Sequence, residues 1–179
     1  MPDPTIREIL ANNFLFRGLS PEELTELADQ VWVENHPEGE TIVRESAPAD
    51  ALFLLVSGGV NVVKRNGQFL AYLGPGGFFG EMALFIKDSQ RTANVIAAEP
   101  TRCVVLSKEF VERFCEQFPS TGLKIYRAII ESLAQRLQAT SADLAMLMEA
   151  QVKGQDQIEG IVARARAKRE SNHEDPNTE

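Results

Sequence analysis

The stretch FFGEMALFIKDSQRTA, residues 78–93, determines how the rest of the chain is interpreted. Gly80 lets the backbone turn sharply and come close to a ligand. The residues that follow predict one turn of helix starting at Glu81, whose free backbone N–H groups form an anion site. Further along, Arg91 offers a planar two-donor fork and Thr92 a hydroxyl donor, which together suit a phosphate. Because a carboxylate repels an anion, we expect Glu81 to accept a hydrogen bond from a sugar hydroxyl beside that phosphate.

On both sides of this stretch, over roughly residues 31–107, the chain consists of short segments rich in β-branched and aromatic residues. Such segments predict strands, here at 31–33, 41–43, 52–56, 60–63, 69–73, 95–96 and 103–106. Glycine and proline separate most of them, and Asn66-Gly67 predicts a type I′ hairpin turn. Many short strands without a helix of useful length between them predict an antiparallel barrel, roll or sandwich rather than βαβ units.

Helical patterns flank the strand region. Before it, Ser20 is a predicted N-cap, Pro21 takes the first helical position and Glu23 completes a capping box. After it, Ser107 can cap a helix that ends near Pro119. The chain is therefore predicted to be mainly β, with helices before and after the strands.

A longer helix is predicted over 119–150. Seven of eight positions spaced in alternating steps of three and four are apolar, which is the a/d seam of a coiled coil; the positions are 123, 126, 130, 133, 137, 140, 144 and 147. Thr140 is the single polar residue in this seam, and it either sets the register or presents a hydroxyl to something at the interface. Such a stripe must be buried against its own domain, against a second copy of the chain, or both.

The last part of the chain is more polar. A short, weak helix is expected over 151–170, and residues 171–179 have the composition of a disordered tail. Four basic residues lie near the end of this helix: Arg164, Arg166, Lys168 and Arg169. They could contact DNA, but a solvated helix face is the favoured interpretation.

Composition excludes several classes of protein. The chain has 18 Lys and Arg against 26 Asp and Glu, a net charge of −8, so a general basic surface for nucleic acid is missing. Its longest apolar run, residues 51–56, is far short of the ~20 residues of a membrane-spanning helix, and the start does not resemble a secretory signal. Two lone cysteines, Cys103 and Cys115, predict reduced thiols and a cytoplasmic location. No catalytic or metal-ligating constellation appears, so we expect a protein that is not an enzyme.

Residues 78–93 resemble the phosphate-binding cassette of the cyclic nucleotide-binding domain family. That cassette reads Phe-Gly-Glu-apolar-Ala/Gly-Leu, a variable loop, then Arg-Ser/Thr/Ala-Ala. This sequence matches it at Phe79, Gly80, Glu81, Met82, Ala83, Leu84, Arg91, Thr92 and Ala93, with Gln90 where many members have proline. The resemblance covers about residues 6–148 and implies a β-roll, or jelly roll (double-stranded β-helix), over 5–118.

Residues 136–141, RLQATS, are similar to the dimerisation helix of the catabolite activator protein (CRP/FNR) branch of that family. The similarity implies a homodimer through the long helix, with Thr140 and Ser141 meeting the base of cyclic AMP. It also implies that Val62, Leu70 and Ala71 line the base and sugar, and that the amides of Met82 and Ala83 join Arg91 and Thr92 at the phosphate. Because only 32 residues follow Leu147, we expect the DNA-binding domain of that branch to be missing.

The expected function is that of a dimeric, cytoplasmic second-messenger receptor without a bound cofactor, signalling through contact with a partner protein. Cyclic AMP is favoured by Thr140 and Ser141, whereas Thr92 resembles the cassette of cyclic-GMP-dependent kinases. Two alternatives remain open. One is a ligand-free dimeric scaffold for a partner protein, and the other is a small DNA-binding regulator that uses the basic C-terminal helix.

Overall fold

The computed structural model describes residues 5–171, apart from the side chains of residues 143, 147, 150 and 152–171. The chain divides into two compact units, one up to residue 130 and one from residue 131 on. In the described range, none of the helices has the length and apolar character needed to cross a bilayer.

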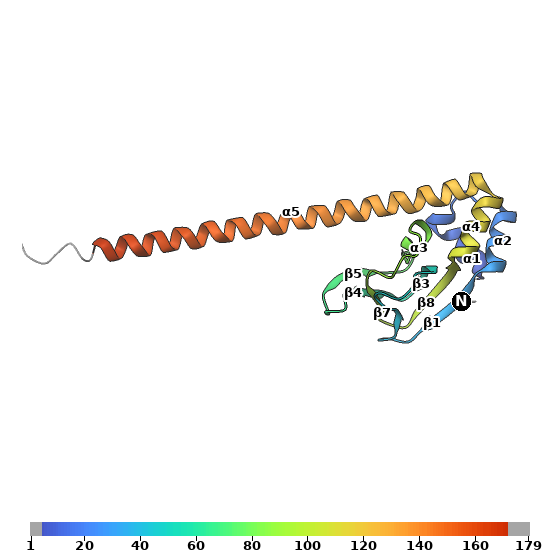
Figure 1. Cartoon of the computed structure of the whole chain (residues 1–179), viewed down its shortest axis with the longest axis horizontal. Helices are drawn as coiled ribbons and strands as arrows, with labels where there is room; N and C mark the ends of the chain where they lie inside the picture. Colours follow the sequence, from blue (N-terminus) through green and yellow to red (C-terminus); the bar gives the residue numbers. More distant parts are fainter. Residues whose placement is uncertain (1–4, 172–179) are drawn as a thin grey trace, which may run out of the picture. The chain divides into compact units, whose positions relative to one another are not determined.

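The first unit contains the strands, with helices before and after them (Figure 1). In chain order the elements are α1 (Ile6–Asn12), the 3₁₀ helix η1 (Phe14–Phe16), α2 (Pro21–Gln30), β1 (Trp32–His36), β2 (Thr41–Val43), β3 (Ala51–Ser57), β4 (Val60–Val63), β5 (Phe69–Leu73), β6 (Phe78–Phe79), α3 (Met82–Phe85), β7 (Asn94–Ala97), β8 (Thr101–Ser107), α4 (Lys108–Gln117) and α5 (Pro119–Ser171), which continues into the second unit.

The strands form two four-stranded sheets, of order β1-β8-β3-β6 and β2-β7-β4-β5. Neighbouring strands pair antiparallel throughout both sheets. The predicted antiparallel fold with flanking helices is therefore confirmed. The two-residue strand β6 was not predicted, because it is too short to show a period.

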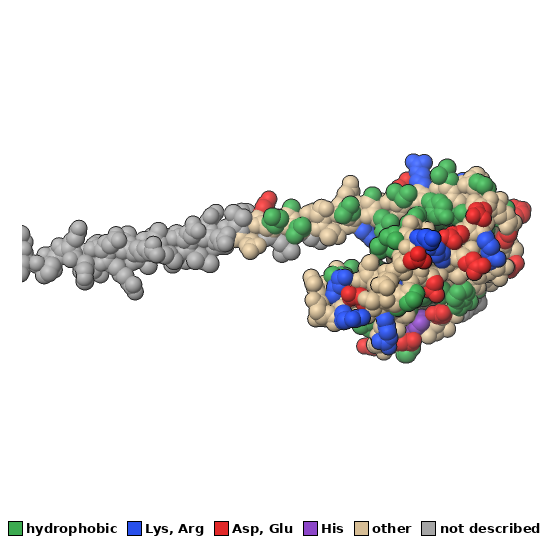
Figure 2. All heavy atoms as spheres, in the orientation of Figure 1, with side chains coloured by type: hydrophobic (Ala, Val, Ile, Leu, Met, Phe, Trp, Pro, Cys, Tyr) green, Lys and Arg blue, Asp and Glu red, His purple; other side chains and the backbone are tan. Residues whose placement is uncertain are grey.

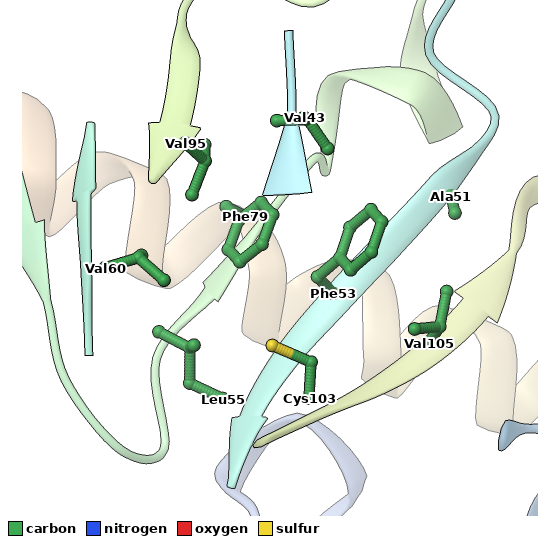
Figure 3. Close-up of a cluster of buried hydrophobic side chains, with 9 residues drawn as sticks. All are labelled: Val43, Ala51, Phe53, Leu55, Val60, Phe79, Val95, Cys103 and Val105. Atoms are coloured by element: carbon green, nitrogen blue, oxygen red, sulfur yellow. The ribbon is translucent and has the colours of Figure 1, made fainter. Parts of the chain in front are cut away.

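A hydrophobic core fills the space between the two sheets (Figure 3). Its buried members are Val43, Ala51, Phe53, Leu55, Val60, Phe79, Val95, Cys103 and Val105. The rings of Phe53 and Phe79 stack with their centroids 4.8 Å apart. Leu52, which alternates with these residues on β3, lines a small cavity together with the helical residues Phe16 and Phe114. Because β3 is buried on both faces, its sequence is a continuous apolar run without alternation.

The hairpin turn between β4 and β5 differs from the prediction. A type I′ turn needs positive φ at both central residues, but Gly67 has φ +85° and Asn66 is not among the described residues with positive φ. The amide of Gly67 donates to the carbonyl of Lys64, and the amide of Lys64 to the carbonyl of Gln68, both at 2.8 Å. The turn is thus a three-residue loop that ends in a left-handed glycine, and the type I′ prediction was wrong.

The predicted helix caps are present. The Ser20 hydroxyl accepts from the amide of Glu23, whose carboxylate accepts in return from the amide of Ser20, and the Ser107 hydroxyl accepts from the amide of Phe110. Glu23 also accepts a hydrogen bond from the buried hydroxyl of Thr121, which ties α2 to the start of α5.

Helix α5 is longer than predicted. It runs without a break from Pro119 to Ser171, so the separate helix expected over 151–170 is the end of α5. Of the predicted tail, residues 172–179 lie outside the described residues. Ile125 and Ile129 of α5 are buried, whereas four seam residues, one per heptad, are between 57% and 70% exposed: Leu123, Ile130, Leu137 and Leu144.

Candidate functional site

The cassette is a sharp turn between strand β6 and the one-turn helix α3. Gly80 has φ +84°, a conformation that only glycine adopts without strain. Glu81 follows in helical conformation as the N-cap of α3, and its side chain is not used to cap the helix. The backbone thus turns immediately before the first amides of α3, as the sequence predicted.

Gly80 is also required because two other groups crowd it. A Cβ atom at this position would lie 2.5 Å from the carbonyl oxygen of Ala51 and 2.6 Å from Nη1 of Arg91. The glycine therefore creates the space in which the arginine side chain crosses the cassette.

Arg91 is the buried charged group of the site. It is 8% exposed, and its guanidinium carbon lies 5.5 Å above the centroid of the Phe53 ring. Nη1 donates to the carbonyl of Ala51 at 2.9 Å, and Nη2 contacts the carboxylate of Asp50 at 3.3 Å. Burial lowers the pKa of Arg91, and the negative charges of Asp50 and Glu81 act in the opposite direction.

A guanidinium has five N–H donors, and the contacts to Ala51 and Asp50 use two of them. Arg91 therefore keeps donor capacity for an anion while its position is already fixed. The sequence reasoning missed Asp50. Its only local sign is its place directly before the buried strand β3, and nothing in that pattern points to a partner 41 residues away.

The amides at the start of α3 differ in their availability. The amide of Ala83 donates to the carbonyl of Gly80 at 3.1 Å, and the residue is fully buried. Met82 is the first residue of α3, where a helix leaves its N–H groups without an intrahelical partner. The Met82 amide is thus the better placed of the two predicted amide donors.

Thr92 follows Arg91 and is exposed, while the next residue, Ala93, is buried. The carbonyl of Thr92 accepts a hydrogen bond from Nζ of Lys64 at 2.7 Å. Thr92, which carries the predicted hydroxyl donor, is therefore accessible. Its backbone is fixed by a hydrogen bond from Lys64 of the neighbouring β4–β5 hairpin.

The predicted wall residues lie on the sheet that contains β7. Val62 of β4 pairs with Ala71 of β5 on one side and with Val95 of β7 on the other. Cross-strand partners share a face of the sheet, so Val62 and Ala71 face the same side. Leu70, the neighbour of Ala71 along the strand, is 46% exposed and lies where the β4–β5 register shifts, between the pairs Val62–Ala71 and Val63–Phe69. The common wall predicted for Val62, Leu70 and Ala71 stays a prediction.

Thr140 and Ser141 belong to the second unit and are exposed on α5. The Thr140 hydroxyl donates to the carbonyl of Arg136, one helical turn earlier, at 2.9 Å. Their predicted contact with a base stays a prediction.

Figure 2 shows acidic and basic side chains mixed over the visible face of the first unit. Among the described residues there is no cluster of three or more His, Cys, Asp or Glu side chains suited to a metal ion. The candidate site of the first unit is a turn that brings together the Arg91 guanidinium, the first amide of α3 and the Glu81 carboxylate.

Known proteins are similar to this chain in sequence and fold. The family model described as "Cyclic nucleotide-binding domain" matches residues 33–118. Glutaminase 2 of Bradyrhizobium diazoefficiens is 35% identical over 138 residues, which are 77% of this chain and 22% of that protein. The CRP-like cAMP-activated global transcriptional regulator of Mycobacterium tuberculosis is 28% identical over 151 residues, 82% of this chain and 65% of that one. The chain thus spans about a fifth of the glutaminase and just under two thirds of the regulator.

A solved structure agrees with the sequence relatives. The cyclic nucleotide-binding domain from Methylobacillus flagellatus superposes with a TM-score of 0.65 at 30% identity, over 75% of this chain and 78% of that one. The cassette turn, the two antiparallel sheets and these similarities lead to one conclusion: the chain belongs to the cyclic nucleotide-binding domain family.

Proposed function

We propose that the chain is a non-enzymatic receptor for a cyclic mononucleotide. Arg91, Thr92 and the first amides of α3 bind the cyclic phosphate. Glu81 accepts from the ribose 2′-hydroxyl, and the face shared by Val62 and Ala71 lies against the sugar and base. Thr140 and Ser141 stay the predicted base contacts from α5.

The observation that carries the proposal is that Arg91 is buried while its guanidinium is only partly paired. A charge that is 8% exposed needs a strong compensating environment, yet its carboxylate partner, Asp50, has a side chain 87% exposed to water. Ala51 and Asp50 together occupy only part of the guanidinium fork. An anion bound at the cassette turn would complete the set of acceptors with charge-assisted hydrogen bonds.

Cyclic AMP is the favoured ligand. The predicted base contacts on α5 point to it, as does the similarity to the mycobacterial relative, which is a cAMP-activated regulator. Thr92 is the residue that would admit cyclic GMP, so both nucleotides belong in the first binding experiment.

The seam of α5 supports a homodimer as the signalling form. Leu123, Ile130, Leu137 and Leu144 recur every seven residues and stay exposed in the single chain, which is how the a positions of a coiled coil look without a partner.

A route from ligand to helix exists within the first unit, because the rings of Phe85 on α3 and Tyr126 on α5 lie 5.6 Å apart. A ligand that shifts α3 would bias α5 and any protein bound to it.

Isothermal titration with cyclic AMP and cyclic GMP tests the binding function. Arg91→Lys keeps the charge but loses the fork, so we expect affinity to fall by about 10- to 100-fold, the equivalent of one charged hydrogen bond. Arg44→Lys, the same change at an exposed residue, is the control. Equal affinity of Arg91→Lys and wild type would contradict the phosphate role of Arg91.

The ribose role has its own test. The wild type should bind 2′-deoxy cyclic AMP more weakly than cyclic AMP, and Glu81→Ala, which has no side-chain acceptor, should bind the two ligands with nearly equal affinity. Persistent discrimination in Glu81→Ala would refute the assignment of Glu81. No heat with either nucleotide would favour the ligand-free scaffold, and salt-dependent retention on duplex DNA would favour the DNA-binding alternative.

A further inference from the structure

Three segments that are distant in sequence meet beside Thr92. They are the loop between β2 and β3, the hairpin turn between β4 and β5, and the chain entering β7. Lys64, the last residue before the hairpin loop, donates from Nζ to the carbonyl of Thr92 at 2.7 Å. Its side chain is 41% exposed, so this bond lies at the rim of the site and not in the core.

Glu45, from the loop between β2 and β3, connects the other parts of this cluster. Its amide donates to the side-chain oxygen of Asn94 at 2.8 Å, at the start of β7. Its carboxylate accepts from the amide of Arg65 at 2.7 Å and lies 3.9 Å from Nζ of Lys64. With a side chain only 22% exposed, Glu45 supports the hairpin turn through Arg65 and lies close to the lysine.

The main chain of Arg91 is fixed by the same loop. Its amide donates to the carbonyl of Ala47, and its carbonyl accepts from the amide of Ser46, both at 2.8 Å. Together with the Lys64 bond one residue later, these contacts fix consecutive peptide groups of the segment that carries Arg91 and Thr92. The side chains of a segment fixed in this way need less ordering when a ligand arrives, and that preorganisation appears as affinity.

We propose that Lys64, supported by Glu45, is a positioning residue for the cyclic-nucleotide site. It acts through the carbonyl of Thr92 and connects the phosphate-binding segment to the β4–β5 hairpin, which carries Val62 and Ala71. The inference rests on the proposed function, because its effect is measured as nucleotide affinity.

The test compares four variants by nucleotide titration and by thermal unfolding without ligand. Lys64→Met removes the donor and should weaken binding about fivefold, the effect of one partly exposed charged hydrogen bond. Lys64→Arg keeps a donor and should bind within about twofold of wild type. Glu45→Gln loosens the support and should weaken binding less than Lys64→Met. Arg44→Met removes the same charge from an exposed neighbouring residue and should leave affinity unchanged.

The ligand-free unfolding midpoint separates positioning from stability. If Lys64 only stabilised the fold, Lys64→Met would lower the ligand-free unfolding midpoint, and Lys64→Arg would not restore the nucleotide affinity. Loss of affinity in both Lys64→Met and Arg44→Met, vanishing at high salt, would mean that general charge is the cause and would overturn the proposal. Unchanged affinity in both Lys64→Met and Glu45→Gln would overturn it too, with the receptor function intact. A wild type that binds neither nucleotide would refute the proposed function, and this inference with it.

Discussion

Replacing Gly80 with alanine should disturb both the fold and the site. The backbone at this residue has φ +84°, which costs an L-amino acid about 1–2 kcal/mol. The new Cβ would also lie 2.5 Å from the carbonyl of Ala51 and 2.6 Å from Nη1 of Arg91. The carbonyl belongs to the buried strand β3, so the guanidinium must move and its bond to Ala51 is lost. A hydrogen bond to a charged group contributes about 1.5–3 kcal/mol, which brings the expected loss of stability to about 2.5–5 kcal/mol.

Gly39 supplies the matched control. It has φ +82°, and a Cβ there would meet no atom within 4 Å. Gly39→Ala should therefore cost only the conformational part, about 1–2 kcal/mol. The free energies of unfolding of both variants follow from urea titrations, and nucleotide titration should show at least a tenfold loss for Gly80→Ala alone. Equal stability and equal affinity of the two variants would refute the argument that Gly80 makes room for Arg91.

Three further predictions concern other parts of the chain. Leu137 is 68% exposed on the seam of α5, so Leu137→Glu should convert a dimer into a monomer in sedimentation experiments while Gln138→Glu does not; a dimer that survives Leu137→Glu would exclude this seam. The pKa of Glu23 is lowered from 4.5, first by the Thr121 hydroxyl and then by the backbone at Ser20, so its contribution to stability is present above pH 4.5 and is lost as pH falls through the lower folded value. Thr121→Val should accordingly show a smaller drop in urea midpoint between pH 7 and pH 3 than wild type, and an equal or larger drop would contradict this. Burial raises the pKa of Cys103 to about 12 and also raises that of Cys115, so neither thiol should react with a thiolate-specific reagent at pH 8 until urea unfolds the protein; rapid labelling of the native protein would show that one is accessible.

The parts of the structure that were predicted correctly depend on local sequence. The strands, the capping box of Ser20 and Glu23, and the glycine turn at Gly80 each follow from residues within a few positions of one another. The turn type of the β4–β5 hairpin was predicted wrongly although it is also a local feature. Asn66-Gly67 suits more than one turn, and the loop length decided which one formed. Helix α5 continues past Gly154, because a single glycine costs a helix only about 1 kcal/mol and does not by itself end it.

The parts of the site that could not be predicted depend on contacts between distant residues. Asp50 meets Arg91 across 41 positions, and Lys64 meets Thr92 across 28. Neither residue has a local pattern that separates it from an ordinary surface charge, and only the pairing of strands brings each to its partner. The cassette itself was recognisable because its residues are nearly consecutive, although their roles in ligand binding stay predictions.

A crystal structure of the protein grown with cyclic AMP tests the central claim most directly. The account predicts an Nη atom of Arg91 within about 3 Å of a cyclic phosphate oxygen, with the Glu81 carboxylate at the same distance from the ribose 2′-hydroxyl. A nucleotide bound elsewhere, with Arg91 in contact only with Ala51 and Asp50, would contradict it.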